Sequence, residues 1–116
     1  MHEMGIVSGI IDAVVASAQD AGATRVLAVN VRIGDMTEVV DEALEFAYDA
    51  LSEGTMCEGA PLNVEKVSPR SLCLECFEEF DHDRFHRACT HCGSYETHLI
   101  AGREMEIVNI EVELPD

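Results

Sequence analysis

Basic residues are scarce in this sequence. Its 116 residues include seven Lys and Arg against 23 Asp and Glu, which gives a formal net charge of −16. Nucleic acids and anionic membrane surfaces would be repelled by a protein of this charge. The same charge would attract metal cations or cationic partners. Alternatively, it serves only to keep the protein soluble. We therefore expect no nucleic-acid partner and no membrane partner.

A basic leader and a long hydrophobic run are also missing. The most apolar stretch, GIVSGIIDAVVASA, is interrupted by Ser8, Asp12 and Ser17, and no Lys or Arg precedes it. It is too short and too polar to cross a bilayer, and it lacks the form of a signal peptide. We therefore expect a cytoplasmic protein. Disulfides are uncommon in that compartment, so the five cysteines favour metal ligands or free thiols.

Signatures of catalysis are absent as well. The glycine-containing stretches SGIIDA and EGAPLN lack the lysine and the spacing of a phosphate-binding loop. The serines, histidines and cysteines are too scattered to argue for a Ser-His-Asp or Cys-His pairing. The sequence predicts a binding protein and not an enzyme.

Apolar periodicity predicts two helices and three strands. Helical stripes run through residues 4–21 and 38–53, while alternating patterns typical of strands cover 25–33, 61–67 and 104–114. In the first strand the alternation places Leu27 on the buried face. Gly22 and Gly54 stand where helices end, and Thr37 or Asp41 is suited to begin the second helix.

Composition changes between residues 68 and 102. This segment holds four of the five cysteines and four of the five histidines, with few aliphatic residues. We therefore predict an α+β fold with two helices on a small three-stranded sheet and an inserted module that resembles a zinc ribbon. The α/β domain would comprise residues 1–67 and 103–116, and the metal-binding module residues 68–102.

The four cysteines of this segment have the spacing of a zinc site. Cys73 and Cys76 form one C-x2-C pair, and Cys89 and Cys92 form a second pair twelve residues later. Each pair can direct two thiolates at one ion, and two facing pairs form the sulfur tetrahedron that suits structural zinc. All four positions are then filled, so the zinc would stabilise the module without catalysis. Gly93 after the second pair favours this turn, whereas Phe77 after the first makes its turn less standard.

Other readings of these residues stay open. The four thiols could form two disulfides, a rubredoxin-type iron centre or a redox C-x-x-C pair. Cys57 stands alone and reads as a small, partly buried side chain. His82, His86, His91 and His98 read as solvated polar residues or as groups that titrate near neutral pH. His82 and His86 are four apart, so on a helix they would share a face and form a potential metal pair.

The first three residues can chelate a transition metal. The α-amine of Met1, the backbone nitrogen of His2 and the imidazole of His2 can close two adjacent chelate rings, and Glu3 can supply a further donor. Nitrogen donors in a plane suit Ni(II) or Cu(II). A histidine at this place often has no metal role, and the chelate requires that Met1 is retained.

The whole pattern resembles the HypA/HybF family of nickel metallochaperones. The resemblance rests on MHEM at the start, VNVRIGD, EALEFAYDALSEGT, EGAPLNVEKV, the two C-x2-C pairs with CTHCGS, and GREMEIVNIEVE at the end. It covers nearly the whole chain. Gly5 stands where serine is common in the family, and CTHC replaces the frequent CPHC, but neither change removes a proposed ligand.

The resemblance implies a nickel site at the N-terminus, with His2 as its main ligand and Met1 and Glu3 as contributors. It also implies structural zinc on Cys73, Cys76, Cys89 and Cys92. The implied partners are a HypB-type GTPase and the precursor of a [NiFe]-hydrogenase large subunit. The alternative from the residues alone is a zinc-ribbon adaptor between proteins, with no role in nickel transfer.

Overall fold

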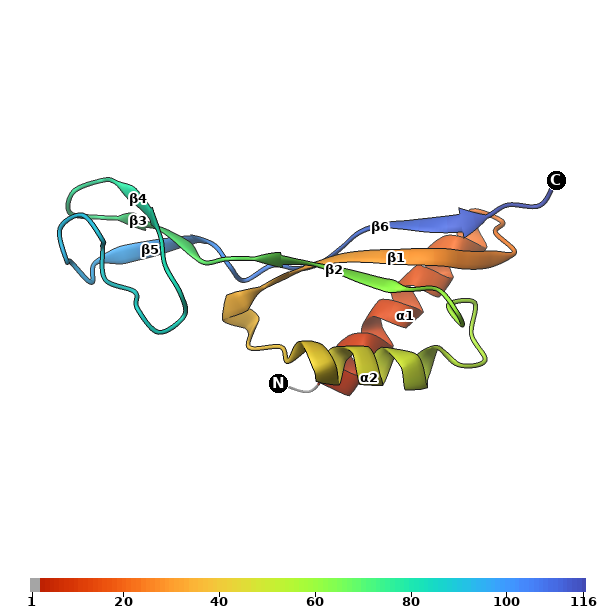
Figure 1. Ribbon diagram of the computed structural model, residues 1–116. Coiled ribbons are helices and arrows are strands. Elements are labelled where there is room, and N and C mark those ends of the chain that lie inside the picture. Colours follow the sequence, from red (N-terminus) through yellow and green to blue (C-terminus); the bar gives the residue numbers. More distant parts are fainter. Residues whose placement is uncertain (1–2) are drawn as a thin grey trace. The chain divides into compact units, whose positions relative to one another are not determined.

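The computed structural model describes residues 3–116, which form two compact units (Figure 1). Of the described residues, unit 1 comprises 3–31, 39–65 and 106–116, and unit 2 comprises 32–38 and 66–105. Met1 and His2, two of the predicted nickel ligands, lie outside the described residues. The predicted fold class is confirmed: there are two helices, a three-stranded sheet and an inserted module that holds the cysteines.

A three-stranded sheet connects β1 (Arg25–Gly34) with β2 (Leu62–Val67) on one side and β6 (Met105–Glu113) on the other. Figure 1 shows β1 and β2 running in the same direction and β6 in the opposite one. A crossover that contains α2 (Asp41–Ser52) joins the parallel pair, as parallel strands require. Three asparagines form a ladder across the sheet: Asn63 Nδ2 donates to Asn30 Oδ1 at 2.8 Å, and Asn30 Nδ2 to Asn109 Oδ1 at 2.6 Å.

Helix α1 (Glu3–Asp20) follows its predicted stripe closely. Val7, Ile11, Val14 and Ala18 are buried at the helical spacing of three and four residues. The helix ends at Asp20, and Gly22 follows with a φ of +72°, which a glycine adopts at little cost. The amide of Ala23 then bonds to the Ala18 carbonyl at 2.9 Å, which completes the cap.

Helix α2 begins later than the sequence indicated, and neither predicted cap is used. Residues Asp35–Thr37 form a 3-10 helix that ends at Glu38, whose left-handed φ of 62° interrupts the helical path. Val40 therefore occupies the N-cap, without a side-chain hydrogen bond, and Asp41 is the first helical residue. The predicted apolar stripe is nevertheless present, with Leu44, Ala47 and Tyr48 buried.

Strand β1 is the centre of the sheet, but its alternation is not regular. Leu27 is 38% exposed, so its predicted burial is wrong, whereas Ala28 and Val29 are both buried although they are consecutive. The amides of Val26 and Val29 bond to the carbonyls of Met56 and Pro61. In a regular strand every second amide points to one side, so donors three residues apart require an irregularity between them.

Unit 2 contains a second sheet that the sequence did not indicate. Strand β3 (Arg70–Cys73) lies between β4 (Glu79–Asp81) and β5 (Thr97–Ala101), and both pairings are antiparallel. These strands are three to five residues long, which is too short for a clear alternating pattern.

No helix within residues 3–116 is long and apolar enough to cross a membrane.

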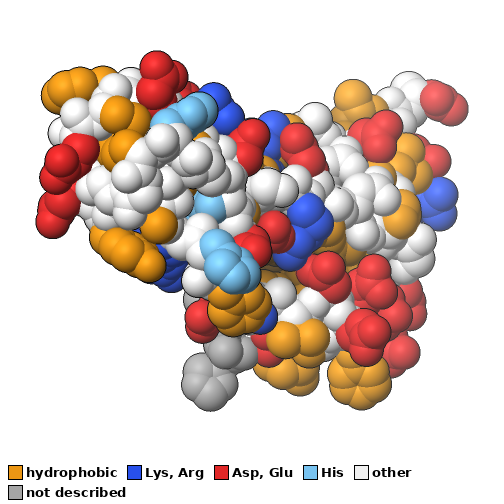
Figure 2. Space-filling model, turned by 60° about the vertical axis from the view of Figure 1, so that its left-hand side comes forward, with side chains coloured by type: hydrophobic (Ala, Val, Ile, Leu, Met, Phe, Trp, Pro, Cys, Tyr) orange, Lys and Arg blue, Asp and Glu red, His pale blue; other side chains and the backbone are white. Residues whose placement is uncertain are grey.

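The charges divide unequally between the units. Unit 1 holds fourteen of the acidic residues and only Arg25 among the basic ones, a net charge of −13, whereas unit 2 holds nine acidic and six basic residues. Figure 2 shows the acidic side chains on the visible face of unit 1. The attraction for cations that the composition indicated therefore belongs mainly to unit 1.

Candidate metal centre

The four predicted zinc ligands come together in unit 2. Cys73 is the last residue of β3, Cys76 follows in a turn, and Cys89 and Cys92 lie in the second turn of the same form. Their sulfur atoms all lie within 4.8 Å of one another. The sulfurs of Cys73 and Cys92 are 3.6 Å apart, as are those of Cys76 and Cys89.

These distances fit a single zinc ion. Four Zn–S bonds of about 2.3 Å in a tetrahedron place the sulfurs about 3.8 Å from one another. The donors are all thiols, which as thiolates prefer zinc or iron to magnesium or calcium. No disulfide joins them. The arrangement therefore fits a closed tetrahedral site in which the protein provides every ligand.

Both turns use the same backbone geometry to direct their sulfurs. In the first, the amides of Glu75 and Cys76 donate to the Cys73 sulfur at 3.4 Å, and the Phe77 amide donates to the Cys73 carbonyl at 3.0 Å. In the second, the His91 amide approaches the Cys89 sulfur at 3.3 Å, and the Gly93 amide bonds to the Cys89 carbonyl at 2.8 Å. Outside their cysteines the two loops differ in sequence, yet their backbone hydrogen bonds correspond.

The residue that closes each turn has a positive φ. Gly93 adopts φ 79°, and Phe77 adopts φ 63° although it carries a side chain. The left-handed conformation costs a non-glycine residue about 1–2 kcal/mol. The predicted difference between the turns is therefore one of strain and not of geometry.

Hydrogen bonds prepare one thiol for metal binding. The amide of Cys76, followed by that of Glu75, lowers the pKa of the Cys73 thiol to about 6. A hydrogen bond from the Glu78 amide lowers the pKa of the Cys76 thiol. Desolvation and the hydrogen bond with Cys73 outweigh this effect and raise that pKa to about 12. One thiolate therefore forms readily, and its charge hinders the next. A divalent cation removes this repulsion and allows all four to ionise.

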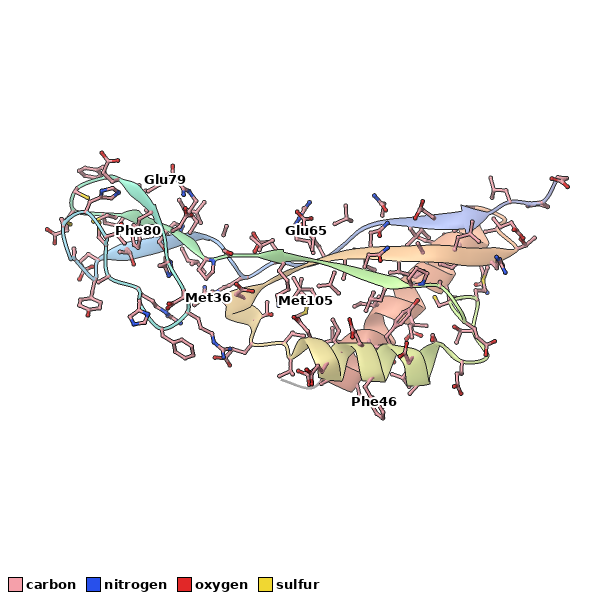
Figure 3. The ribbon with its side chains drawn as sticks, in the orientation of Figure 1. Met36, Phe46, Glu65, Glu79, Phe80 and Met105 are labelled. Carbon is pink, nitrogen blue, oxygen red and sulfur yellow. The ribbon has the colours of Figure 1, made fainter. Side chains whose placement is uncertain are left out.

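The centre of unit 2 is small and consists largely of the ligands. Phe80 on β4 is 3% exposed and packs with Cys73 and Cys89, with Cys76 against them; Figure 3 labels Phe80. A metal ion bound to these sulfurs would therefore stabilise unit 2 as a hydrophobic core stabilises other domains.

Cys57, by contrast, is fully buried in unit 1. Burial raises the pKa of its thiol, as expected of an inert packing residue.

The histidines of the module do not share a helical face. Residues 82–87 are not helical: His82 directly follows β4, and His86 follows a bend at residues 84–85. His82 Nε2 lies 2.8 Å from Ser71 Oγ, and His86 Nδ1 lies 2.8 Å from Asp83 Oδ2. Among the described residues, the four cysteines are the one cluster of at least three possible metal ligands. Because residues 82–87 are not helical, the expectation that His82 and His86 share a helical face is wrong.

Glu3 is the one predicted nickel ligand that the structure describes. It lies in the first turn of α1, and its Oε2 accepts a hydrogen bond from the Val40 amide at 3.1 Å. Val40 is the N-cap of α2, so this bond connects the beginnings of the two helices of unit 1. The carboxylate is therefore held in place beside the chain start.

Comparison with known proteins decides the family. A family model described as "Hydrogenase/urease nickel incorporation, metallochaperone, hypA" matches residues 1–112. The chain belongs to the HypA family. The Hydrogenase maturation factor HypA of Geobacter metallireducens is 38% identical to this HypA-family chain over 113 residues, with 97% of the chain and 100% of the relative covered. That of Chlorobium phaeobacteroides is 41% identical over 114 residues, with the same coverage.

Solved structures agree on the fold of this HypA-family protein. The solution structure of the Ni metallochaperone HypA from Helicobacter pylori has a TM-score of 0.70 at 23% identity, with 99% of this chain and 100% of that chain covered. A second solution structure of HypA protein gives a TM-score of 0.72 at 24% identity, with 97% and 96% covered. The chain thus has the HypA fold along its length, and its family is described as one of nickel incorporation.

Proposed function

We propose that this protein carries Ni(II) at its N-terminus and delivers it during [NiFe]-hydrogenase maturation. The ligands would be the α-amine of Met1, the backbone nitrogen and imidazole of His2, and a donor from Glu3. The observation that carries the proposal is the family match over residues 1–112, which includes the MHE start and belongs to a family named for nickel incorporation. The curated relatives that it resembles are hydrogenase maturation factors.

The structure of unit 1 supports a cation at this place. Glu3, in the first turn of α1, accepts a hydrogen bond from the Val40 amide, and the unit holds fourteen acidic residues and a single arginine. The positive end of the helix dipole opposes a cation, but a nearby carboxylate and the negative field offset it. A site formed by the first three residues of a chain would exchange its ion readily. That property suits transfer better than storage.

The four-cysteine site would hold zinc for a structural purpose. Four protein thiolates fill the tetrahedron and leave no position for cargo or substrate. The proposed roles are therefore separate: the cysteines keep unit 2 folded, and the N-terminus carries nickel. The domain division proposed with these roles has residues 68–102 as the zinc module and residues 1–67 and 103–116 as the nickel-binding domain; the compact units differ from it chiefly because unit 2 includes residues 32–38.

Release would occur by ligand exchange with a partner. The proposed nickel acceptor is the precursor of the hydrogenase large subunit, and the proposed partner in delivery is a HypB-type GTPase. The chain has no phosphate-binding loop of its own, so nucleotide hydrolysis would have to come from that partner. The family description names both hydrogenase and urease, and the hydrogenase assignment rests on the curated relatives.

Nickel titration of zinc-loaded protein with an authentic start tests the proposal. We expect one nickel per chain, and we expect His2→Ala to weaken its binding by more than about tenfold while zinc content stays unchanged. His86→Ala is the matched control, because His86 is an exposed histidine of unit 2 paired with Asp83. A two-residue N-terminal extension should act like His2→Ala, since it displaces the α-amine.

Glu3 is tested separately. Glu3→Gln keeps an acceptor for the Val40 amide but removes the charge, whereas Glu3→Ala removes both. If the carboxylate binds nickel, Glu3→Gln weakens nickel binding without lowering thermal stability. Nickel binding that survives both the extension and His2→Ala would refute the proposal and favour the zinc-ribbon adaptor.

A further inference from the structure

A cavity in unit 2 has the chemistry of an oxyanion site. Its volume is about 280 Å³, and all of its lining residues belong to unit 2. Six of these residues carry hydrogen-bonding side chains and none is acidic: Ser71, His82, Arg87, Thr97, His98 and Arg103. In a chain with 23 Asp and Glu, a cavity lined by two arginines and no carboxylate is unexpected.

The two arginines are not neutralised by the protein. Arg70 of the same unit shows the usual arrangement, since it bonds to Glu79 at 3.1 Å and to Asp81 at 2.7 Å. Among residues 3–116, no carboxylate pairs with Arg87, whose Nε donates to the Arg84 carbonyl at 3.3 Å. Arg103 likewise has no ion pair with any residue that the structure describes.

The nearest carboxylates in sequence have other hydrogen bonds. Glu104 follows Arg103, but its Oε1 accepts from the Gly102 amide at 2.7 Å. Asp83 precedes Arg87, but its oxygens accept from the Phe85 amide at 2.8 Å and face the His86 ring. These contacts stabilise the two loops that contain the arginines. Apart from the Nε–H of Arg87, which donates to the Arg84 carbonyl, the guanidinium groups therefore keep their donors for a ligand.

The remaining wall is formed by the module sheet. Ser71 lies on the central strand β3, where it is 3% exposed, and Thr97 lies on the neighbouring β5. The Ser71 hydroxyl lies 2.8 Å from His82 Nε2, and the other ring nitrogen of His82 lies 2.7 Å from the Asp83 carbonyl. A carbonyl only accepts, so that second nitrogen carries the proton. The ring is thereby fixed against the wall of the cavity.

We propose that this cavity binds a small oxyanion, of the phosphate or polycarboxylate class. Arginine presents planar, paired donors that match the oxygens of such groups, and the Thr97 hydroxyl adds a further donor. A water occupies about 30 Å³ of liquid, so the cavity has room for a tetrahedral oxyanion with waters or for a larger polycarboxylate. Both histidine and basic side chains are on the face of this unit seen in Figure 2. Unit 2 would thus bind an anion while unit 1 attracts cations.

Titration of the zinc-loaded full chain with sodium phosphate, at ionic strength held constant with sodium chloride, tests the proposal. We expect saturable shifts of the Thr97, Leu99 and Arg103 amides in ¹H–¹⁵N spectra, with a dissociation constant on the order of 1 mM, because the arginines are exposed and their charges are screened. Parallel titrations with sulfate and citrate distinguish tetrahedral oxyanions from polycarboxylates. Competition at the same amides indicates one shared site.

The variants decide which groups bind. The double variant Arg87→Gln/Arg103→Gln should bind phosphate at least tenfold more weakly than the parent. An unchanged zinc content shows that this variant is folded. Arg84→Gln is the matched control, because Arg84 lies over the Phe85 ring at 4.8 Å and does not line the cavity; its affinity should stay within twofold of the parent. The proposal is overturned if none of the three anions produces a saturable shift, or if the double variant binds phosphate as the parent does.

Discussion

At the scale of single residues, Phe77 is the position where the sequence departs most from its local structure. It closes the first cysteine turn with φ 63°, which Gly93 adopts without strain in the second. Its side chain is 75% exposed, so packing compensates little of the conformational cost. The chain therefore keeps an exposed aromatic ring at a strained position beside its metal site.

Replacing Phe77 by glycine should stabilise the zinc-loaded module. Relief of the left-handed conformation is worth about 1–2 kcal/mol, and the added freedom of the unfolded chain offsets about half of it. We expect a net gain of about 0.5–1 kcal/mol in the free energy of unfolding, measured by denaturant titration. Phe85→Gly is the control, since Phe85 is 76% exposed and has no positive φ. A loss of stability in Phe77→Gly would mean that the ring has contacts worth more than the strain.

At the scale of elements, two glycines let two segments of unit 2 approach closely. A Cβ added to Gly34 at the end of β1 would overlap the Gly102 carbonyl, and the Met36 amide bonds to that carbonyl at 2.7 Å. Gly34 has an ordinary extended backbone, φ −79° and ψ 149°. Space, and not conformation, is therefore what requires glycine here.

Gly34→Ala should cost about 3 kcal/mol, because the methyl group meets backbone atoms that cannot move aside cheaply. Gly9→Ala is the contrasting variant: Gly9 lies within α1 with nothing within 4 Å of the added carbon, so alanine should stabilise by up to about 1 kcal/mol. Both are measured as free energies of unfolding of zinc-loaded protein. Equal stability of the two variants would contradict the close approach.

The elements also show what the sequence can predict. Helix α1 was predictable because Val7, Ile11, Val14 and Ala18 repeat at the helical period. The start of α2 was not, because nothing in the residue type of Glu38 indicates its left-handed φ. The metal cluster was predictable from local spacing, since each turn fixes its own pair of sulfurs. The cavity was not, because it brings together residues from 36 to 103 that share no local pattern.

At the scale of the whole molecule, the two units differ in what stabilises them. Unit 1 buries an aliphatic core from α1, β1 and α2 that includes Val7, Val29 and Leu44. The buried cluster around the sulfurs in unit 2 is Cys73, Phe80 and Cys89. A hydrophobic core of that size is too small to offset the entropy of ordering its chain. The metal should therefore matter to one unit and not to the other.

Removal of zinc should unfold unit 2 and leave unit 1 intact. Zinc is removed with a thiol-reactive reagent and a chelator, without denaturant. In ¹H–¹⁵N spectra the amide signals of unit 2 should then lose their dispersion, whereas those of residues such as Val14 and Leu44 should keep it. Cys73→Ser should have the same effect, whereas Cys57→Ser should leave zinc content unchanged, because Cys57 is buried in unit 1. If the spectrum instead collapsed along the entire chain, the two units would form one cooperative structure, and the aliphatic core of unit 1 would be insufficient by itself.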